Sequence, residues 1–133
     1  MKIVKVVAAV ILHETKILCA LKGDHKYEYL SNKYEFPGGK VELNETSEQA
    51  IVREVFEELN LLIRVKKHLI TVSHEYPNFK IELITFLCET YSINNLIIQE
   101  HKKVEWLNSS ELLSLDWAAA DKPIVNYLLE NQI

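Results

Sequence analysis

The chain has 133 residues, and 48% of them are hydrophobic, which predicts one compact domain over residues 1–133 with a substantial buried core. The formal net charge of −4 and the isoelectric point near 5.7 argue against a nucleic-acid polymer as partner, because phosphate backbones bind basic surfaces. A small anionic substrate stays open if a metal ion supplies the positive charge.

The first predicted element is a strand at residues 4–12, a nearly unbroken run of β-branched and aliphatic side chains. Such a run is typical of a strand that is covered on both faces, so helices should flank the sheet on both sides. The apolar stretch 3–12 is too short to span a membrane, carries Lys5 and lacks a signal-peptide cleavage site. We therefore expect a cytoplasmic protein without a membrane partner.

A second strand is predicted at residues 17–22, and a polar, tyrosine-bearing loop at 23–33 then leads to the Pro-Gly-Gly segment 37–39. We expect this loop to border the substrate. Cys19 and Cys88 both lie in apolar runs, where a free buried thiol is the common arrangement, so no disulfide is expected.

The first predicted helix begins at Thr46 or Ser47, either of which can cap it, and ends at Asn60. Asn is suited to this end because it tolerates the left-handed conformation that follows many helices. The apolar stripe of the helix, which should face the sheet, consists of Ala50, Ile51, Val55 and Leu59.

The remaining residues predict a hairpin, a last strand and two short helices. The hairpin strands are 62–75 and 79–89, joined by a Tyr-Pro-Asn turn at 76–78. The last strand is 104–107, Ser109 or Ser110 caps a short helix, and a closing helix has the apolar stripe Ile124, Val125, Leu128 and Leu129. The expected fold class is α/β, an α/β/α sandwich with a central mixed sheet.

Three carboxylates, Glu54, Glu57 and Glu58, fall on one face of the first helix within an arc of about 100°. The simplest interpretation is a solvated acidic face. However, like charges at this spacing each cost a helix about 0.2–0.5 kcal/mol, and the acids are expected to lack Lys or Arg partners four residues away. A hard divalent ion such as Mg²⁺ takes oxygen ligands, so this face predicts a metal site that also holds substrate phosphates.

These acids belong to a longer pattern, Gly-x5-Glu-x7-Arg-Glu-Val-x-Glu-Glu-x-Asn-Leu, which runs from Gly39 to Leu61. The pattern resembles the Nudix box, the metal-binding loop and helix of the Nudix hydrolases. The chain is similar over almost its full length to the MutT-like branch, with further matching segments at 35–42, 76–77 and 120–123. The resemblance implies a Nudix fold and Mg²⁺-dependent cleavage of nucleoside triphosphates to monophosphates and pyrophosphate.

The resemblance also implies roles for individual residues. It places Mg²⁺, or Mn²⁺ in its place, on the Gly38 carbonyl and on four acids, namely Glu54, Glu57, Glu58 and Glu100. Glu54 is implied as the general base that activates water. A plain loop carboxylate is an equal alternative for Glu100. Glu45 and Arg53 should pair, because an Arg fork suits a carboxylate, and so support the loop and the helix.

Four residues are expected to contact the nucleotide: Lys22, Phe36, Lys40 and Asp121. Lys22 matches a family position that is often Arg, and Lys40 can reach a phosphate as a point charge. Phe36 either stacks on the base or packs within the protein.

Asp121 matches a position where MutT has an amide, and an ionised carboxylate can only accept hydrogen bonds. It would accept from the exocyclic amine of cytosine or adenine, so the resemblance favours the CTP-pyrophosphohydrolase-like branch and a cytosine or modified-cytosine nucleotide. Two alternatives stay open. Asp121 can instead be the N-cap of the last helix, and a protonated Asp121 can donate to guanine.

Other functions compatible with this sequence are hydrolysis of 8-oxo-dGTP, ADP-ribose or dinucleoside polyphosphates, and non-enzymatic sensing of nucleotides on the same fold. No competing catalytic motif is present, and the five histidines are interpreted as ordinary surface or core residues. We expect a monomer or weak homodimer whose partner is a small nucleotide.

Overall fold

Strand β1 (Ile3–His13) is the centre of a mixed sheet in the computed structural model, which describes residues 1–133. It runs parallel to β6 (Lys80–Glu89) along one edge. Along its other edge it pairs with β4 (Gly38–Lys40) and, near its end, with β2 (Lys16–Leu21), both antiparallel. This change of partner brings the glycine-containing strand β4 against the middle of the sheet.

Three further strands complete the sheet. Strand β5 (Arg64–Glu75) is antiparallel to β6, while β3 (Tyr34–Glu35) and β7 (Lys103–Leu107) both pair with β2. The strand order is β3-β2-β1-β6-β5, with β4 attached to β1 and β7 attached to β2. The predicted mixed sheet is therefore confirmed.

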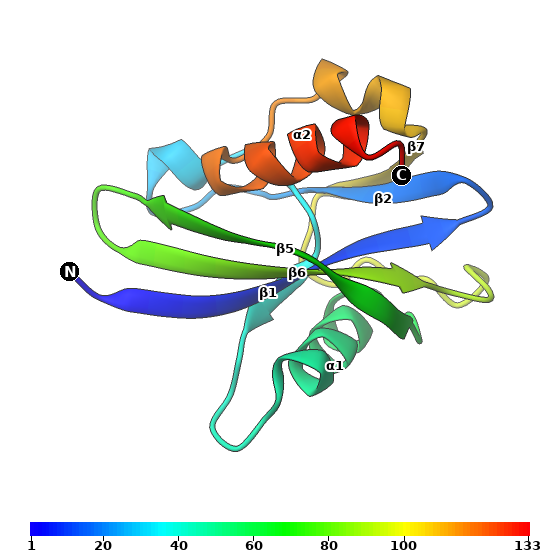
Figure 1. The fold of residues 1–133 in the computed structure, drawn as a ribbon, viewed down its shortest axis with the longest axis horizontal. Helices are drawn as coiled ribbons and strands as arrows, with labels where there is room; N and C mark the ends of the chain where they lie inside the picture. Colours follow the sequence, from blue (N-terminus) through cyan, green and yellow to red (C-terminus); the bar gives the residue numbers. More distant parts are fainter.

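Helices cover both faces of the sheet (Figure 1). Helix α1 (Ser47–Leu59) lies on one face, and α2 (Lys122–Glu130) lies on the other with the 3₁₀ helix η2 (Ser109–Ser114). Two more 3₁₀ helices, η1 (Glu28–Leu30) and η3 (Ala119–Asp121), are parts of the connections. The expected α/β/α sandwich is the observed architecture.

The side chains on the two faces of β1 belong to two separate hydrophobic clusters, because successive side chains of a strand point to opposite faces. Ala8 and Val10 belong to the cluster that contains the buried side chains of α2. Val7, Ala9 and Ile11 belong to the cluster that contains α1. This explains why the β1 sequence is apolar at consecutive positions rather than at alternate ones.

Local signals define both ends of α1 as predicted. The Thr46 side chain accepts a hydrogen bond from the Gln49 backbone, and the Gln49 side chain accepts one from the Thr46 backbone, which is a capping box. Asn60 ends the helix in the left-handed conformation, with φ 54° and ψ 33°. The predicted stripe is buried, and Glu58 is buried with it, so the acids lie beside the stripe and towards β4 rather than on the opposite face of the helix.

Several predicted boundaries and caps are wrong. The hairpin strands begin at Arg64 and Lys80, and β5 contains register shifts opposite β6. Asn108 rather than Ser109 or Ser110 precedes η2, and its backbone N–H donates a hydrogen bond of 2.9 Å to the Glu111 side chain. No helix of the structure is long and apolar enough to cross a membrane.

Candidate active site

A cavity of about 670 Å³ opens beside β1 and β4, within the usual size range for a small-molecule site. Its floor is apolar sheet surface, including Val4, Val6 and Leu83. Its walls come from the end of α1, the segment before β7, the loop 22–30, the β5–β6 turn and η3. The loop that was expected to border the substrate thus lines this cavity.

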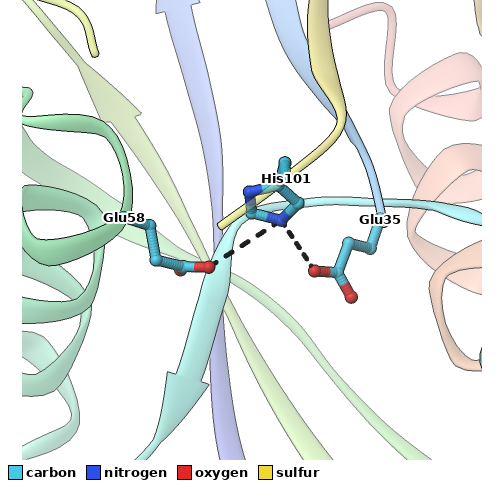
Figure 2. A group of neighbouring side chains, drawn as sticks. All are labelled: Glu35, Glu58 and His101. Carbon is cyan, nitrogen blue, oxygen red and sulfur yellow. Dashed lines mark hydrogen bonds and ion pairs between the residues drawn. The ribbon is translucent and has the colours of Figure 1, made fainter. Parts of the chain in front are cut away.

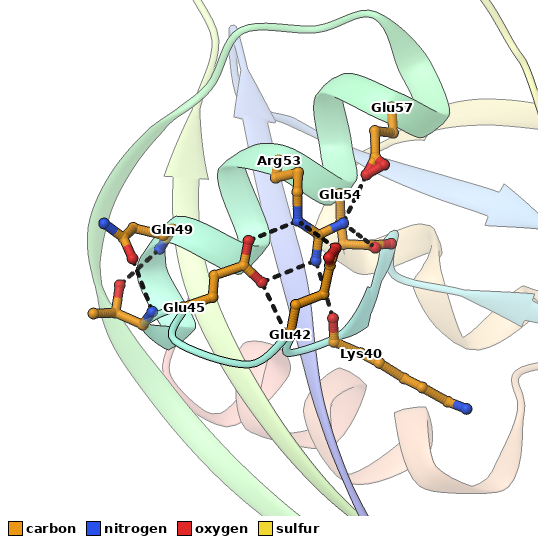
Figure 3. Close-up of polar contacts among 8 residues, drawn as sticks. Lys40, Glu42, Glu45, Gln49, Arg53, Glu54 and Glu57 are labelled. Atoms are coloured by element: carbon orange, nitrogen blue, oxygen red, sulfur yellow. Dashed lines mark hydrogen bonds and ion pairs between the residues drawn. The ribbon is translucent and has the colours of Figure 1, made fainter.

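Arg53 is the organising residue of the acidic helix (Figure 3). Its guanidinium donates two hydrogen bonds to Glu45, at 2.6 and 3.0 Å, and one to the Lys40 carbonyl at 3.1 Å. It also donates to Oε1 of Glu54 at 2.7 Å and to Oε1 of Glu57 at 2.6 Å. The predicted Glu45–Arg53 pair is present.

The same contacts correct one expectation about the helix acids. Arg53 and Glu57 are an i, i+4 pair, so the acidic face does have a basic partner at helical spacing. The hydrogen bonds from Arg53 and from the Glu42 backbone lower the pKa of Glu45 to about 2. Since Arg53 contacts only Oε1 of Glu54 and of Glu57, the Oε2 atom of each stays free of it.

The Glu54 carboxylate lies so close to Gly39 that no side chain could be accommodated at position 39. A Cβ atom on Gly39 would lie 2.0 Å from Oε2 of Glu54 and 2.3 Å from its Cδ. Burial raises the pKa of Glu54, and the charges of Glu57 and Glu100 add to this, although Arg53 acts in the opposite direction. The absent side chain at Gly39 is therefore what allows this carboxylate to approach β4.

Glu58 is a buried carboxylate at the edge of the cavity, only 4% exposed. Its Oε1 accepts a hydrogen bond of 3.1 Å from the Gly38 backbone. Burial, followed by the nearby charges of Glu35, Glu100 and Glu54, raises its pKa to about 9. An ionised Glu58 thus needs a cation close to it, and an all-oxygen set of carboxylates suits Mg²⁺, so the residues fit the predicted metal.

The other two expected metal ligands are more open to solvent. The Glu57 side chain is 52% exposed beside Arg53. Glu100 is exposed and lines the cavity, and its charge raises the pKa values of both Glu54 and Glu58. The structure therefore brings Glu100 to the acids of α1, as the metal-ligand interpretation requires.

Two residues of the cavity were missed by sequence reasoning, Glu35 and His101. The His101 Nε2 lies 2.9 Å from Oε2 of Glu35 and 3.8 Å from Oε2 of Glu58 (Figure 2). Ligand atoms of these three residues lie within 4.8 Å of one another, so the group can itself hold a metal ion. The only signal in the sequence was that each is adjacent to a residue already selected, Phe36 or Glu100.

The expected nucleotide contacts all line the cavity, but not all are available as predicted. Lys22 Nζ lies 3.6 Å from Oε1 of Glu35. The Lys40 side chain extends away from Arg53, whereas its carbonyl faces it (Figure 3). The Phe36 ring is 3% exposed and stacks on Trp117 with centroids 4.6 Å apart. Phe36 therefore packs within the protein, and the prediction that its ring stacks on a base is not supported.

Asp121 does not cap α2 with its side chain. Its Oδ1 instead accepts a hydrogen bond of 3.0 Å from the Phe36 backbone N–H, across 85 residues of sequence. Burial, together with the charge of Glu35, raises the pKa of Asp121. Asp121 therefore occupies the N-cap position of α2 without a capping hydrogen bond from its side chain, and it lines the cavity.

An aromatic group that was not predicted forms another part of the cavity wall. Tyr29 stacks on Tyr27 and on Tyr76, with centroids 5.3 and 5.2 Å apart. Phe79 lies 5.4 Å from Tyr76, and Tyr29 donates a hydrogen bond to Asn78. These rings pack the loop 22–30 against the β5–β6 turn and give this side of the cavity an apolar surface.

Comparison with known proteins identifies a matching family model and similar proteins. The family model of the NUDIX domain matches residues 6–127. A CTP pyrophosphohydrolase of Escherichia coli K12 is 33% identical over 125 residues, which cover 94% of this chain and 90% of that protein. An 8-oxo-dGTP diphosphatase of the same strain is 33% identical over 97 residues, which cover 73% of this chain and 74% of that protein.

A solved structure agrees with these relatives. The MutT protein of methicillin-resistant Staphylococcus aureus 252, a Nudix hydrolase, superposes with a TM-score of 0.76 at 40% identity. The match covers 98% of this chain and 99% of that one.

Proposed function

This chain belongs to the Nudix hydrolase family, and from that membership we propose that it cleaves a nucleoside triphosphate to the monophosphate and pyrophosphate. It is thus an enzyme that acts on phosphoric anhydride bonds rather than a nucleotide sensor. The observation that carries the proposal is the buried carboxylate of Glu58, grouped with Glu54 and Glu100 at the edge of a cavity of nucleotide size.

The ligands that we propose for Mg²⁺, with Mn²⁺ as a substitute, are Glu54, Glu57, Glu58, Glu100 and the Gly38 carbonyl. Divalent ions, when bound, neutralise phosphate oxygens and lower the pKa of coordinated water. The protein holds these ligands in place: the Gly38 N–H orients one oxygen of Glu58, and Arg53 orients one oxygen each of Glu54 and Glu57.

Glu54 is the general base of the proposed reaction. Arg53 holds its Oε1, and its Oε2 is the oxygen left to take a proton from the attacking water. Glu45 supports this geometry through Arg53, which it binds with two hydrogen bonds at 2.6 and 3.0 Å. The pair therefore acts on the reaction by keeping Glu54 and Glu57 in place.

A cytosine or modified-cytosine nucleotide is the substrate that we propose, with Asp121 as the base-reading residue. Its Oδ1 is occupied by the Phe36 N–H, so its second oxygen is the one that faces the base. As an acceptor it suits the exocyclic amine of cytosine. Lys22 and Lys40 are proposed phosphate contacts, because both line the same cavity.

A second candidate substrate is 8-oxo-dGTP. It is favoured by the burial that raises the pKa of Asp121, because a protonated carboxyl can donate a hydrogen bond to guanine. The 8-oxo-dGTP diphosphatase of E. coli is as similar to this chain as the CTP enzyme, though over a shorter stretch.

Hydrolysis of a panel of substrates, with the products separated and identified, tests both candidates, because ADP-ribose gives AMP and ribose 5-phosphate whereas the triphosphates give a monophosphate and pyrophosphate. The panel contains CTP, dCTP, 5-substituted dCTP, 8-oxo-dGTP and ADP-ribose, each measured as kcat/KM with Mg²⁺ and with excess chelator. We expect kcat/KM for a cytosine nucleotide to exceed that for the other substrates by about tenfold or more, and we expect excess chelator to abolish turnover. A preference for 8-oxo-dGTP selects the second candidate, and cleavage of ADP-ribose alone contradicts both.

The wider setting is also part of this proposal. We propose a single Nudix domain over residues 1–133 that acts in the cytoplasm as a monomer or weak homodimer on a small nucleotide. Cys19 and Cys88 are both buried and unpaired, in keeping with a reducing compartment.

A further inference from the structure

His101 connects the metal-binding part of the cavity to the part that holds Asp121. Its ring reaches Glu35 at the end of β3 and faces Glu58 in the last turn of α1 (Figure 2). The His101 side chain is 3% exposed and that of Glu58 is 5% exposed, so the contact lies away from bulk solvent. Electrostatic interactions between charged groups are stronger in a site that is shielded from water.

All polar contacts of the His101 ring are made by one nitrogen. Nε2 is 2.9 Å from Glu35, whereas Nδ1 is buried without a hydrogen-bond partner. Because Glu35 is also paired with Lys22, its oxygens act as acceptors, and Nε2 carries the hydrogen that is donated to Glu35. Nε2 is therefore the nitrogen through which the ring lies close to both carboxylates.

The backbone around His101 is held in place without this side chain. The Gln99 N–H donates to the Glu58 carbonyl at 3.0 Å, and the Lys102 N–H donates to the Leu21 carbonyl at 2.9 Å. These bonds tie the segment to α1 on one side and to β2 on the other. Loss of the His101 side chain should therefore change the cavity more than it changes the fold.

One oxygen of the Glu58 carboxylate accepts a hydrogen bond, and the other lies near the His101 ring. Gly38 N–H donates to Oε1 at 3.1 Å, and the remaining Oε2 has the His101 ring at 3.8 Å, too far for a hydrogen bond but close enough to limit its rotation. We propose that His101 is a positioning residue, which holds the Glu58 carboxylate between the Gly38 N–H and its own Nε2 in the orientation that binds the divalent ion. This inference rests on the proposed metal role of Glu58.

Two substitutions separate this role from simple packing. His101→Leu keeps much of the side-chain volume but removes Nε2, whereas His101→Gln places an amide N–H at the same number of bonds from Cα. The matched control is His13→Leu, which removes another partly buried imidazole, one that contacts the Thr90 carbonyl outside the cavity. For each protein we would measure the melting temperature, kcat and KM, and the affinity for Mg²⁺ and for Zn²⁺ by calorimetry without nucleotide.

The expected result is that His101→Leu loses the most Mg²⁺ affinity and the most kcat. Its Mg²⁺ affinity and its kcat fall by about 10- to 100-fold, as is typical when a group that orients a metal ligand is removed. Its melting temperature stays near that of the wild type. In His101→Gln the decreases in Mg²⁺ affinity and in kcat are at most half as large, on a logarithmic scale, as in His101→Leu. His13→Leu keeps the wild-type Mg²⁺ affinity and kcat.

Three results would overturn the inference. One is a His101→Leu protein with wild-type Mg²⁺ affinity and kcat, and another is equal loss in the Gln and Leu variants. The third is a loss of Zn²⁺ affinity with Mg²⁺ affinity unchanged, because imidazole favours zinc and the cluster would then be a separate metal site. Since calorimetry needs no turnover, absence of hydrolysis in the wild type would refute the proposed reaction while this test still applied to His101.

Discussion

The Gly39→Ala substitution tests whether Glu54 must occupy its observed position. The added Cβ would lie 2.0 Å from Oε2 of Glu54, whereas ordinary contacts at such a carbon are 3.4 Å or longer. The carboxylate must therefore retreat by more than about 1 Å, and a displacement of this size in a catalytic group costs about 100-fold in rate. The clash involves the end of a side chain, so we expect the fold to be kept.

The assay is pyrophosphate release together with thermal unfolding for three glycine variants. In Gly38→Ala the Cβ would meet the Val7 carbonyl of β1 at 1.9 Å, a backbone atom that cannot move aside. That variant should lose about 3 kcal/mol of unfolding free energy, or about 10 °C in Tm. In Gly23→Ala the nearest atom is 3.6 Å away, so both readouts should match the wild type.

The reasoning is refuted by a fully active Gly39→Ala protein, because the position of Glu54 would then not matter. It is also refuted if Gly39→Ala unfolds as readily as Gly38→Ala, since the clash would not be confined to the carboxylate.

Three further predictions concern single carboxylates. Glu54→Gln should lower kcat by about 10²- to 10⁴-fold with little change in Tm, and unchanged turnover would remove Glu54 from the role of base. Asp121→Asn should raise the kcat/KM ratio of 8-oxo-dGTP to CTP by about tenfold or more, and an equal loss on both substrates would mean that Asp121 only holds the Phe36 backbone. Hydrogen bonds from Arg53 and from the Glu42 backbone lower the pKa of Glu45 from 4.5 to about 2, so ionised Glu45 stabilises the fold above pH 4.5 and this stabilisation is lost as the pH falls towards 2. The stability difference between wild type and Glu45→Gln, measured by denaturation, should shrink over that range, and a constant difference would contradict the role of this pair.

Much of the fold follows from short-range patterns in the chain. The consecutive apolar residues of β1 predict coverage on both faces, and the observed clusters on either side of Val7 and Ala8 confirm it. Thr46 and Asn60 set the ends of α1 through hydrogen bonding and backbone conformation alone. The exact strand starts were less predictable, because the register shifts in β5 depend on its pairing with β6.

Spacing along the chain predicted the part of the candidate site that lies on α1, whereas Lys22, Lys40, Glu100 and Asp121, which also line the cavity, were selected through the family resemblance. Helical spacing places Glu54 and Glu58 near each other, but it does not reveal that Arg53 donates to several acids at once. The Glu35–His101 contact joins residues 66 positions apart, and the Asp121–Phe36 contact joins residues 85 apart. Such contacts depend on how β3, η3 and the segment before β7 meet, which no local pattern encodes.

The central claim is that the acids of α1 hold divalent cations, which in turn hold a polyphosphate. Calorimetric titration of the wild-type protein with Mg²⁺ and a non-hydrolysable CTP analogue tests it most directly. The account predicts uptake of Mg²⁺ and a nucleotide affinity that falls sharply when Mg²⁺ is left out or when Glu58→Gln is used. Equal nucleotide affinity with and without Mg²⁺, or no uptake of either, would contradict it.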